Sequence, residues 1–216
     1  MKKIAIYGAG GFGKEVHSLI NAINSVELKW NLIGYFDDGK LKGSTHNFMP
    51  ILGGIDDLNN VKEEISIVFS ISNPVVVKTL YNMITNCNVE FPTITAPDIL
   101  FLNFSSVNLK KGNVFMFQCL VSCDVEIGEF NLFNCGVSIG HDTVIGDFNC
   151  FMSYSKLSGE VVVGDSNYFG SCCLVLQQKI IGNETVIGAN SVIMRNTENK
   201  NTYLGNPAIK ILKPNK

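Results

Sequence analysis

Three histidines are the first candidates for acid-base chemistry, because the pKa of imidazole lies close to neutral pH. They are His17, His46 and His141. His17 lies in a segment with helical spacing, where a packing or surface role is expected, and His46 lies in a polar loop without a recognisable partner. His141 stands in "VSIGHDTVIGD", at a place in a six-residue repeat where a side chain can point outward toward a ligand. It is the strongest candidate of the three.

A second candidate site is the glycine-rich stretch "YGAGGFGKEV". Gly8, Gly10 and Gly13 fit G-x-G-x-x-G after a short apolar strand, and Asp37 and Asp38 end the next predicted strand. Backbone N–H groups at such a loop attract a pyrophosphate, and a carboxylate at the second strand binds a ribose, so NAD is one possible ligand. Against NAD, a region of about 95 residues forms only half a Rossmann unit, and no hydride-transfer site follows.

The elements that position the glycine loop alternate between strand and helix. Apolar runs predict strands over residues 2–8, 32–38, 64–72 and 89–95. Helical spacing predicts helices over 10–23 and 73–86, the second opened by Asn73 and Pro74. This alternation favours a small parallel sheet with helices on its faces, an α/β half-Rossmann domain over residues 1–96.

From about residue 97 the pattern changes to a period of six. Steps of six from Leu109 to Ile193 meet fifteen apolar residues and no polar one, and glycine often follows. Such a repeat is typical of a parallel β-helix, in which three hexamers form one triangular coil. Residues 97–216 are therefore predicted to form a β-helix with a C-terminal tail.

The repeat resembles the left-handed β-helix of the hexapeptide-repeat acyltransferases. Within it, "GHDTVIG" is similar to the G-H-[DNE]-x-x-I-G motif of sugar acetyltransferases, among them the bacillosamine-pathway and perosamine-type N-acetyltransferases and the sialic acid O-acetyltransferases. The resemblance implies that His141 is the general base. Asp142 is expected to bind the substrate amine or to orient His141, although adjacent strand residues point to opposite faces. Asn134 matches a family residue near the substrate amine.

The acetyl donor has its own predicted contacts. One coil is eighteen residues, so Gly159 stacks on His141 at about 4.8 Å, where its N–H suits the oxyanion of a thioester. The resemblance implies the same role for Gly159 and assigns further acetyl-CoA contacts to four residues near the end of the chain, Gly188, Ala189, Asn206 and Pro207. The segment "LVLQQKIIG" departs from the usual Pro-Gly of the family, which leaves the path of the CoA open.

The family also offers a different ligand for the glycine loop. Its members bind a nucleotide-activated sugar with a GAGG-[FH]-G-[KR]-E-V loop, a G-[FY]-x-D-D strand end and an [SG]-x-[SG]-[ND] strand end. This chain contains all three motifs. The backbone N–H groups of the loop would bind the pyrophosphate of a sugar nucleotide in the same way as that of NAD. The predicted substrate-binding residues are Gly8, Gly10, Gly11, Phe12, Asp37, Asp38, Ser72 and Asn73.

Composition narrows the partners further. A net charge of −2 without a basic cluster argues against nucleic acid, and the lack of a long apolar run argues against membrane insertion. The seven cysteines contain no C-x-x-C pair, so we expect mostly buried thiols in a cytoplasmic protein. No ligand spacing predicts a metal site. The family resemblance implies a homotrimer.

Together these features predict an acetyl-CoA-dependent N-acetyltransferase acting on a UDP- or dTDP-linked 4-amino-4,6-dideoxy sugar, for surface polysaccharide (O-antigen, lipopolysaccharide) or glycan synthesis. Two alternatives remain at this point. One is an O-acetyltransferase of a sialic acid-type sugar, with the same base acting on a hydroxyl. The other is a non-catalytic scaffold with a nucleotide-sensing loop.

Overall fold

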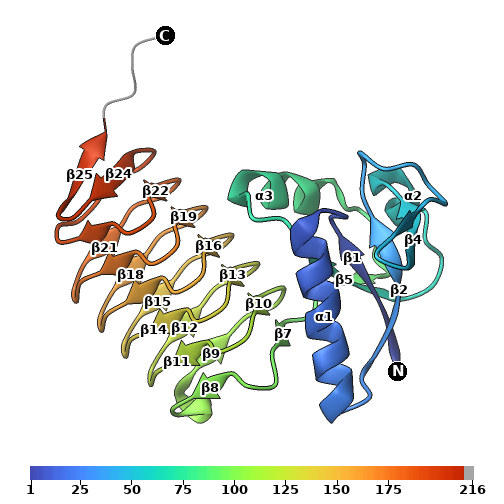
Figure 1. Cartoon of the computed structure of the whole chain (residues 1–216), viewed down its shortest axis with the longest axis horizontal. Helices are drawn as coiled ribbons and strands as arrows, with labels where there is room; N and C mark the ends of the chain where they lie inside the picture. Colours follow the sequence, from blue (N-terminus) through green and yellow to red (C-terminus); the bar gives the residue numbers. More distant parts are fainter. Residues whose placement is uncertain (212–216) are drawn as a thin grey trace, which may run out of the picture. The chain divides into compact units, whose positions relative to one another are not determined.

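The computed structural model describes residues 1–211 and divides the chain into two compact units (Figure 1). The first unit is Met1–Pro97 and the second is Asp98–Lys216. Residues 212–216, the end of the predicted C-terminal tail, lie outside the described part.

The first unit is built around a six-stranded sheet of order β3-β4-β2-β1-β5-β6. Strand β1 pairs in parallel with both β2 and β5, as the alternation of strands and helices predicts. The bounds of the elements are β1 Lys2–Tyr7, α1 Gly11–Val26, β2 Trp30–Phe36, β3 Thr45–His46, β4 Met49–Gly53, α2 Ile55–Asn59, β5 Ile65–Phe69, α3 Pro74–Met83, β6 Val89–Glu90 and β7 Ile94–Thr95.

Burial explains why α1 holds its place on this sheet. Val16, Leu19 and Ile20 on one face of α1 are fully buried, as are Ile4 and Ile6 of β1. Apolar side chains removed from water at helical spacing stabilise a helix against a sheet. The first turn of α1, which follows Gly8 and Gly10 of the glycine loop directly, is thus fixed by the core below it.

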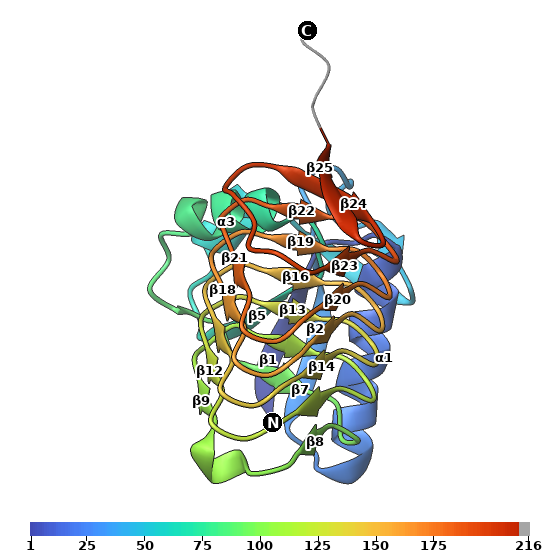
Figure 2. The same cartoon turned by 90° about the vertical axis from the view of Figure 1, so that its left-hand side faces the viewer.

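The second unit is a left-handed parallel β-helix, which confirms the predicted fold class. Figure 2 shows its coils stacked one on another. Paired strands between β9 and β23 are eighteen residues apart, as Phe133 and Phe151 are. The bounds are β8 Leu100–Phe101, η1 Phe104–Ser106, β9 Asn108–Leu109, β10 Val114–Phe115, β11 Leu120–Val121, β12 Glu126–Ile127, β13 Leu132–Phe133, β14 Ser138–Ile139, β15 Val144–Ile145, β16 Cys150–Phe151, β17 Lys156–Leu157, β18 Val162–Val163, β19 Tyr168–Phe169, β20 Leu174–Val175, β21 Ile180–Ile181, β22 Val186–Ile187, β23 Val192–Ile193, β24 Thr202–Gly205 and β25 Ala208–Ile211.

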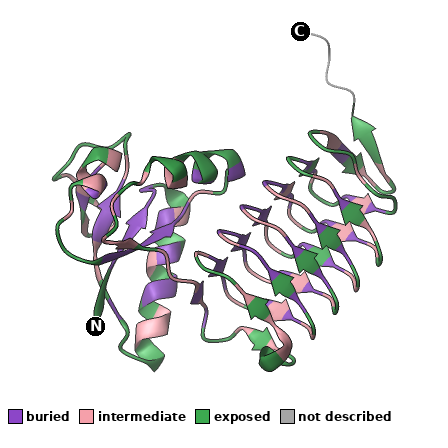
Figure 3. Ribbon diagram, turned by 180° about the vertical axis from the view of Figure 1, so that it is seen from behind, coloured by how far each residue is buried: buried purple, intermediate pink, exposed green. Residues whose placement is uncertain are grey.

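The repeat residues fill the interior of the β-helix, so buried and exposed residues alternate around each coil (Figure 3). Four phenylalanines, 115, 133, 151 and 169, form one stacked column with centroids 4.3 to 5.0 Å apart. A second column consists of buried asparagines, in which the side-chain oxygen of each accepts the backbone N–H of the next coil, as Asn149 does from Asn167 at 2.9 Å. These columns fix the register of the coils, because each side chain contacts its equivalent one coil away.

The cysteines are less buried than the composition suggests. Cys119, Cys150 and Cys173 are buried, whereas Cys123 and Cys135 are half-buried and Cys87 and Cys172 are exposed. The expectation that most of them fill the core is therefore wrong. The exposed Cys172 lies at a corner of the β-helix with φ +58°, where a side chain leaves the coil instead of entering it.

Candidate active site

His141 lies at a corner of the β-helix, between β14 and β15. Its Nδ1 is 2.7 Å from Oδ2 of Asp142, and the two side chains are 59% and 58% exposed. Because a carboxylate can only accept, the neutral imidazole in this geometry carries its ring hydrogen on Nδ1 and its lone pair on Nε2. The arrangement leaves an accessible imidazole with its basic nitrogen turned away from Asp142.

The position of Asp142 corrects one expectation. Adjacent residues on a strand point to opposite faces, but Asp142 is not in a strand: its φ is +55°. This left-handed turn conformation, which Asp and Asn adopt more readily than most residues, brings its carboxylate to the same side as the imidazole.

Gly159 lies one coil beyond His141 and touches its ring. A Cβ at Gly159 would lie 2.5 Å from both Cε1 and Nε2 of His141, so only glycine leaves room for the imidazole in this position. The backbone N–H of Glu160 donates to the carbonyl oxygen of His141 at 2.8 Å. The structure thus brings together three of the predicted residues at one corner: His141, Asp142 and Gly159.

Asn134 is not part of this corner. It follows β13, which belongs to a different sheet from β14, so it lies at another corner of the coil. Its side chain is 7% exposed and its Oδ1 accepts the backbone N–H of Cys135 at 2.7 Å. Within one chain Asn134 acts as a turn cap, and a contact with the substrate amine stays a prediction.

The four residues predicted to bind acetyl-CoA gather near the last coils. Gly188 lies under β24, where an added Cβ would be 2.3 Å from Leu204 Cδ1, and Ala189 follows it. Asn206 and Pro207 form the turn of the antiparallel β24–β25 hairpin. Both are exposed, while Gly205 N–H donates to Ser191 Oγ at 3.0 Å and ties the hairpin to the coil below.

In the first unit, the glycine loop borders a pocket of about 450 Å³. Seven of the eight predicted substrate-binding residues line it: Gly8, Gly10, Gly11, Phe12, Asp37, Asp38 and Ser72. The eighth, Asn73, caps α3, where its Oδ1 accepts the backbone N–H groups of Val75 and Val76 at 3.0 and 3.3 Å. Tyr7, Val76 and Leu80 also line the pocket and were missed. Apolar strand and helix positions carry no sequence signal for a ligand.

The two aspartates shape this pocket differently. Asp37 Oδ2 accepts Ala9 N–H at 2.7 Å and so holds the glycine loop, and its Oδ1 accepts Gly39 N–H at 2.9 Å. Asp38 Oδ2 accepts the Tyr7 hydroxyl at 2.6 Å. Burial, and then this hydrogen bond, raise the pKa of Tyr7 well above its usual range, so its hydroxyl remains a donor.

The helix start completes the pocket. α1 begins at Gly11 after Gly10, which supplies no side-chain cap. The first backbone N–H groups of a helix lack partners within the helix and carry a partial positive charge, which suits an anion.

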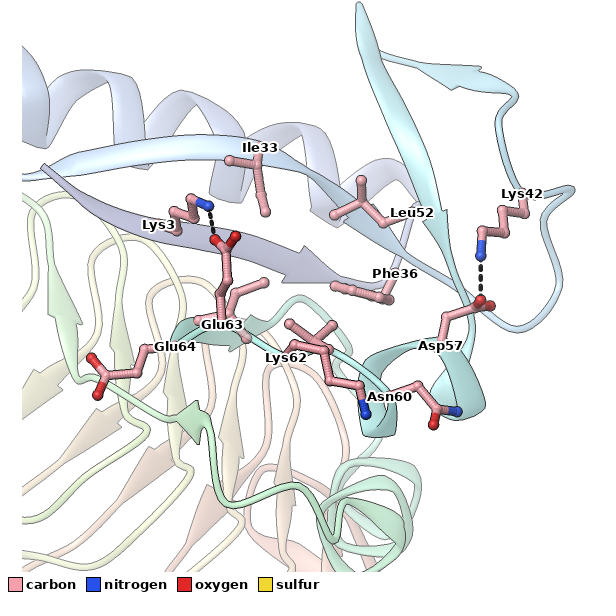
Figure 4. A pocket seen from close by; sticks show the side chains of 12 residues that line it. Lys3, Ile33, Phe36, Lys42, Leu52, Asp57, Asn60, Lys62, Glu63 and Glu64 are labelled. Carbon is pink, nitrogen blue, oxygen red and sulfur yellow. Dashed lines mark hydrogen bonds and ion pairs between the residues drawn. The ribbon is translucent and has the colours of Figure 1, made fainter.

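A second hollow of about 470 Å³ lies elsewhere in the first unit, and none of the predicted site residues lines it (Figure 4). Ile33, Phe36 and Leu52 lie along it, and two ion pairs flank it, Lys3 with Glu63 and Lys42 with Asp57. Its mixed charge and apolar side chains indicate no particular chemistry.

Two negative findings concern residues 1–211. Within them, no three His, Cys, Asp or Glu side chains form a group that could hold a metal ion. None of the helices described there has the length and apolar character needed to cross a membrane.

Comparison with known proteins agrees with this geometry. Residues 3–84 match the family model of the PglD N-terminal domain. A search of curated proteins gave no significant match. Among solved structures, WeeI from Acinetobacter baumannii AYE is 26% identical with a TM-score of 0.87, over 98% of this chain and 100% of that chain.

Two further structures have the same fold. The acetyltransferase domain of PglB from Neisseria gonorrhoeae is 24% identical, with a TM-score of 0.87 over 98% of this chain and 100% of that chain. PerB from Caulobacter crescentus, in complex with CoA and GDP-perosamine, is 22% identical, with a TM-score of 0.88 over 98% of each chain. Residues 3–84 therefore match the family model of the PglD N-terminal domain, and the chain as a whole has the fold of the hexapeptide-repeat sugar acetyltransferases, which confirms the predicted resemblance.

Proposed function

We propose that this protein is an acetyl-CoA-dependent N-acetyltransferase that acts on the amino group of a nucleotide-linked 4-amino-4,6-dideoxy sugar. The observation that carries the proposal is the corner at which His141 is held by Asp142 and lies against Gly159. The similar PerB structure was determined with CoA and GDP-perosamine, which supports a nucleotide sugar as acceptor and acetyl-CoA as donor.

The chemistry is direct transfer. His141 Nε2 accepts a proton from the sugar amine while the amine nitrogen bonds to the acetyl carbon of acetyl-CoA. Asp142 stabilises the resulting imidazolium through its hydrogen bond with Nδ1. The N–H of Gly159 stabilises the oxyanion of the tetrahedral intermediate, whose collapse breaks the C–S bond. The imidazolium then returns its proton to the departing CoA thiolate.

A covalent acetyl-cysteine is disfavoured at the three buried cysteines. Burial raises the pKa of the thiols of Cys119, Cys150 and Cys173 to about 12. At neutral pH these groups are thiols, and the thiolate is the nucleophilic form.

The glycine-loop pocket is the proposed site for the nucleotide. Amides at the start of α1 attract the diphosphate, and the carboxylates of Asp37 and Asp38 accept hydrogen bonds from base or ribose. Ala9 N–H already donates to Asp37, so this aspartate also keeps the loop open for the diphosphate.

The test is a thiol-release assay with acetyl-CoA against UDP- and dTDP-linked 4-amino sugars, their hydroxyl counterparts and a sialic acid. Thiol release with an amino sugar supports the proposal. Turnover confined to hydroxyl acceptors would indicate an O-acetyltransferase, and nucleotide binding without turnover would indicate a scaffold. Ping-pong kinetics would contradict direct transfer.

Assembly and setting are part of the same proposal. We expect a cytoplasmic homotrimer that supplies acetylated sugar nucleotides for surface polysaccharide or glycan synthesis. Sedimentation equilibrium measures the assembly directly, and a monomeric mass would contradict it.

A further inference from the structure

Glu160 occupies a distinctive place at the corner of His141. It follows Gly159, and it takes on its coil the position that Asp142 takes one coil earlier, eighteen residues before it. Both residues have the left-handed conformation, with φ of +59° and +55°. Glu160 N–H donates to the carbonyl oxygen of His141 at 2.8 Å, so its backbone is fixed against the candidate base.

The orientation of the imidazole directs the substrate toward this coil. Nδ1 is bound by Asp142, while Cε1 and Nε2 face Gly159, with both atoms 2.5 Å from the position of an added Cβ. An amine that gives its proton to Nε2 therefore lies beside the coil of Gly159 and Glu160.

The Glu160 side chain is itself anchored. Gln178, eighteen residues further along, donates from Nε2 to Glu160 Oε2 at 3.1 Å. A long side chain at an exposed corner is ordinarily free to rotate, and this bond restricts it. The carboxylate is thus held beside the next coil, where it does not bind the imidazole.

We propose that Glu160 is a specificity-determining residue that favours an amino sugar over its hydroxyl counterpart. This inference rests on the proposed function and names the acceptor group at the same site. A sugar amine arrives largely as an ammonium ion at neutral pH, and the carboxylates of Asp142 and Glu160 attract it. The bound ion loses one proton to solvent before the neutral amine attacks and gives its next proton to His141. A neutral hydroxyl gains no such attraction. For an exposed carboxylate the expected preference is about threefold to fivefold.

The experiment measures binding apart from turnover. Isothermal titration in the presence of CoA gives the Kd of the amino sugar nucleotide and of its hydroxyl counterpart for the wild type, Glu160→Gln and Glu160→Asp. The matched control is Glu184→Gln, which changes a carboxylate in the same backbone conformation (φ +54°) at another corner, beside Lys200. Thermal melting of each variant checks the fold.

We expect Glu160→Gln to weaken binding of the amine about threefold to fivefold and to leave binding of the hydroxyl compound unchanged. Glu160→Asp should retain part of the preference, Glu184→Gln all of it, and about 1 M NaCl should abolish it in the wild type. An unchanged preference in Glu160→Gln would overturn the role of Glu160.

The outcomes separate the inference from the function on which it rests. If thiol release fails with every amino sugar while Glu160→Gln still loses its preference for the amine, the transferase proposal fails and the binding role stands. If thiol release succeeds and the preference is unchanged in Glu160→Gln, the transferase proposal stands and the binding role of Glu160 fails.

Discussion

The corner of His141 and the glycine-loop pocket are built in different ways. At the corner, a repeat of eighteen residues per coil places each side chain over its equivalent, so Gly159 meets His141 by register alone. In the pocket, residues from four separate segments converge, and Asp37 reaches back twenty-eight residues to Ala9. The corner of His141, a site made by the register of the coils, therefore depends on the local fit of a few atoms. The glycine-loop pocket, a site made by converging segments, depends on loops held by hydrogen bonds.

Gly159→Ala tests the site made by register. The added methyl group would collide with Cε1 and Nε2 of His141 and displace the imidazole, so we expect kcat/KM to fall about 100-fold. Steady-state kinetics measures this, with Ser158→Ala, the preceding residue, as the control. Activity close to that of the wild type would show that the ring position is unimportant.

Asn149→Ala tests the scaffold that sets the register. It leaves the buried N–H of Asn167 without its acceptor, and we expect the free energy of unfolding to fall by about 2 to 3 kcal/mol. Denaturant unfolding measures the change, and Asn31→Ala, at an exposed strand position, serves as the control. Equal stability of the two variants would contradict a structural role for the column.

Asp37→Ala tests the convergent pocket. Without its carboxylate the loop loses the bond to Ala9, so KM for the sugar nucleotide should rise about tenfold while KM for acetyl-CoA stays the same. Asp56→Ala, an exposed change on α2, is the control. A rise in both KM values would show that the change is not confined to the pocket.

Substitution of His17 has the smallest expected effect, which is on the pH dependence of the free energy of unfolding. Burial lowers its pKa, so the folded state binds a proton less readily than the unfolded state. The contribution of neutral His17 to the free energy of unfolding is therefore fully present above about pH 6.5 and declines as the pH falls below that value. Denaturant unfolding at several pH values should show a smaller decline for His17→Gln than for the wild type. An equal decline would exclude this contribution.

The same contrast explains what the sequence could predict. The β-helix follows from apolar residues at every sixth position, and the stacking of Gly159 on His141 follows from the coil length. The turn at Asp142 was missed when Asp142 was treated as a strand residue, although the left-handed conformation recurs at every sixth residue from Gln118 to Asn190 and so follows from the same repeat.

In the first unit the β3–β4 hairpin was missed because its left-handed turn contains no glycine. Asn47 and Phe48 have φ of +47° and +65°, although phenylalanine rarely adopts this conformation and glycine is the usual signal for such a turn. Tyr7 was missed because a buried strand residue shows its hydrogen bond to Asp38 only in the folded chain.

The central claim is that His141 is the base of a direct acetyl transfer, and His141→Ala tests it most directly. General-base catalysis contributes about 10²- to 10⁴-fold. We therefore predict that kcat for release of the CoA thiol falls by about 10³-fold, while the Kd for CoA and the melting temperature stay at their wild-type values. Turnover retained within about tenfold of the wild type would contradict the account.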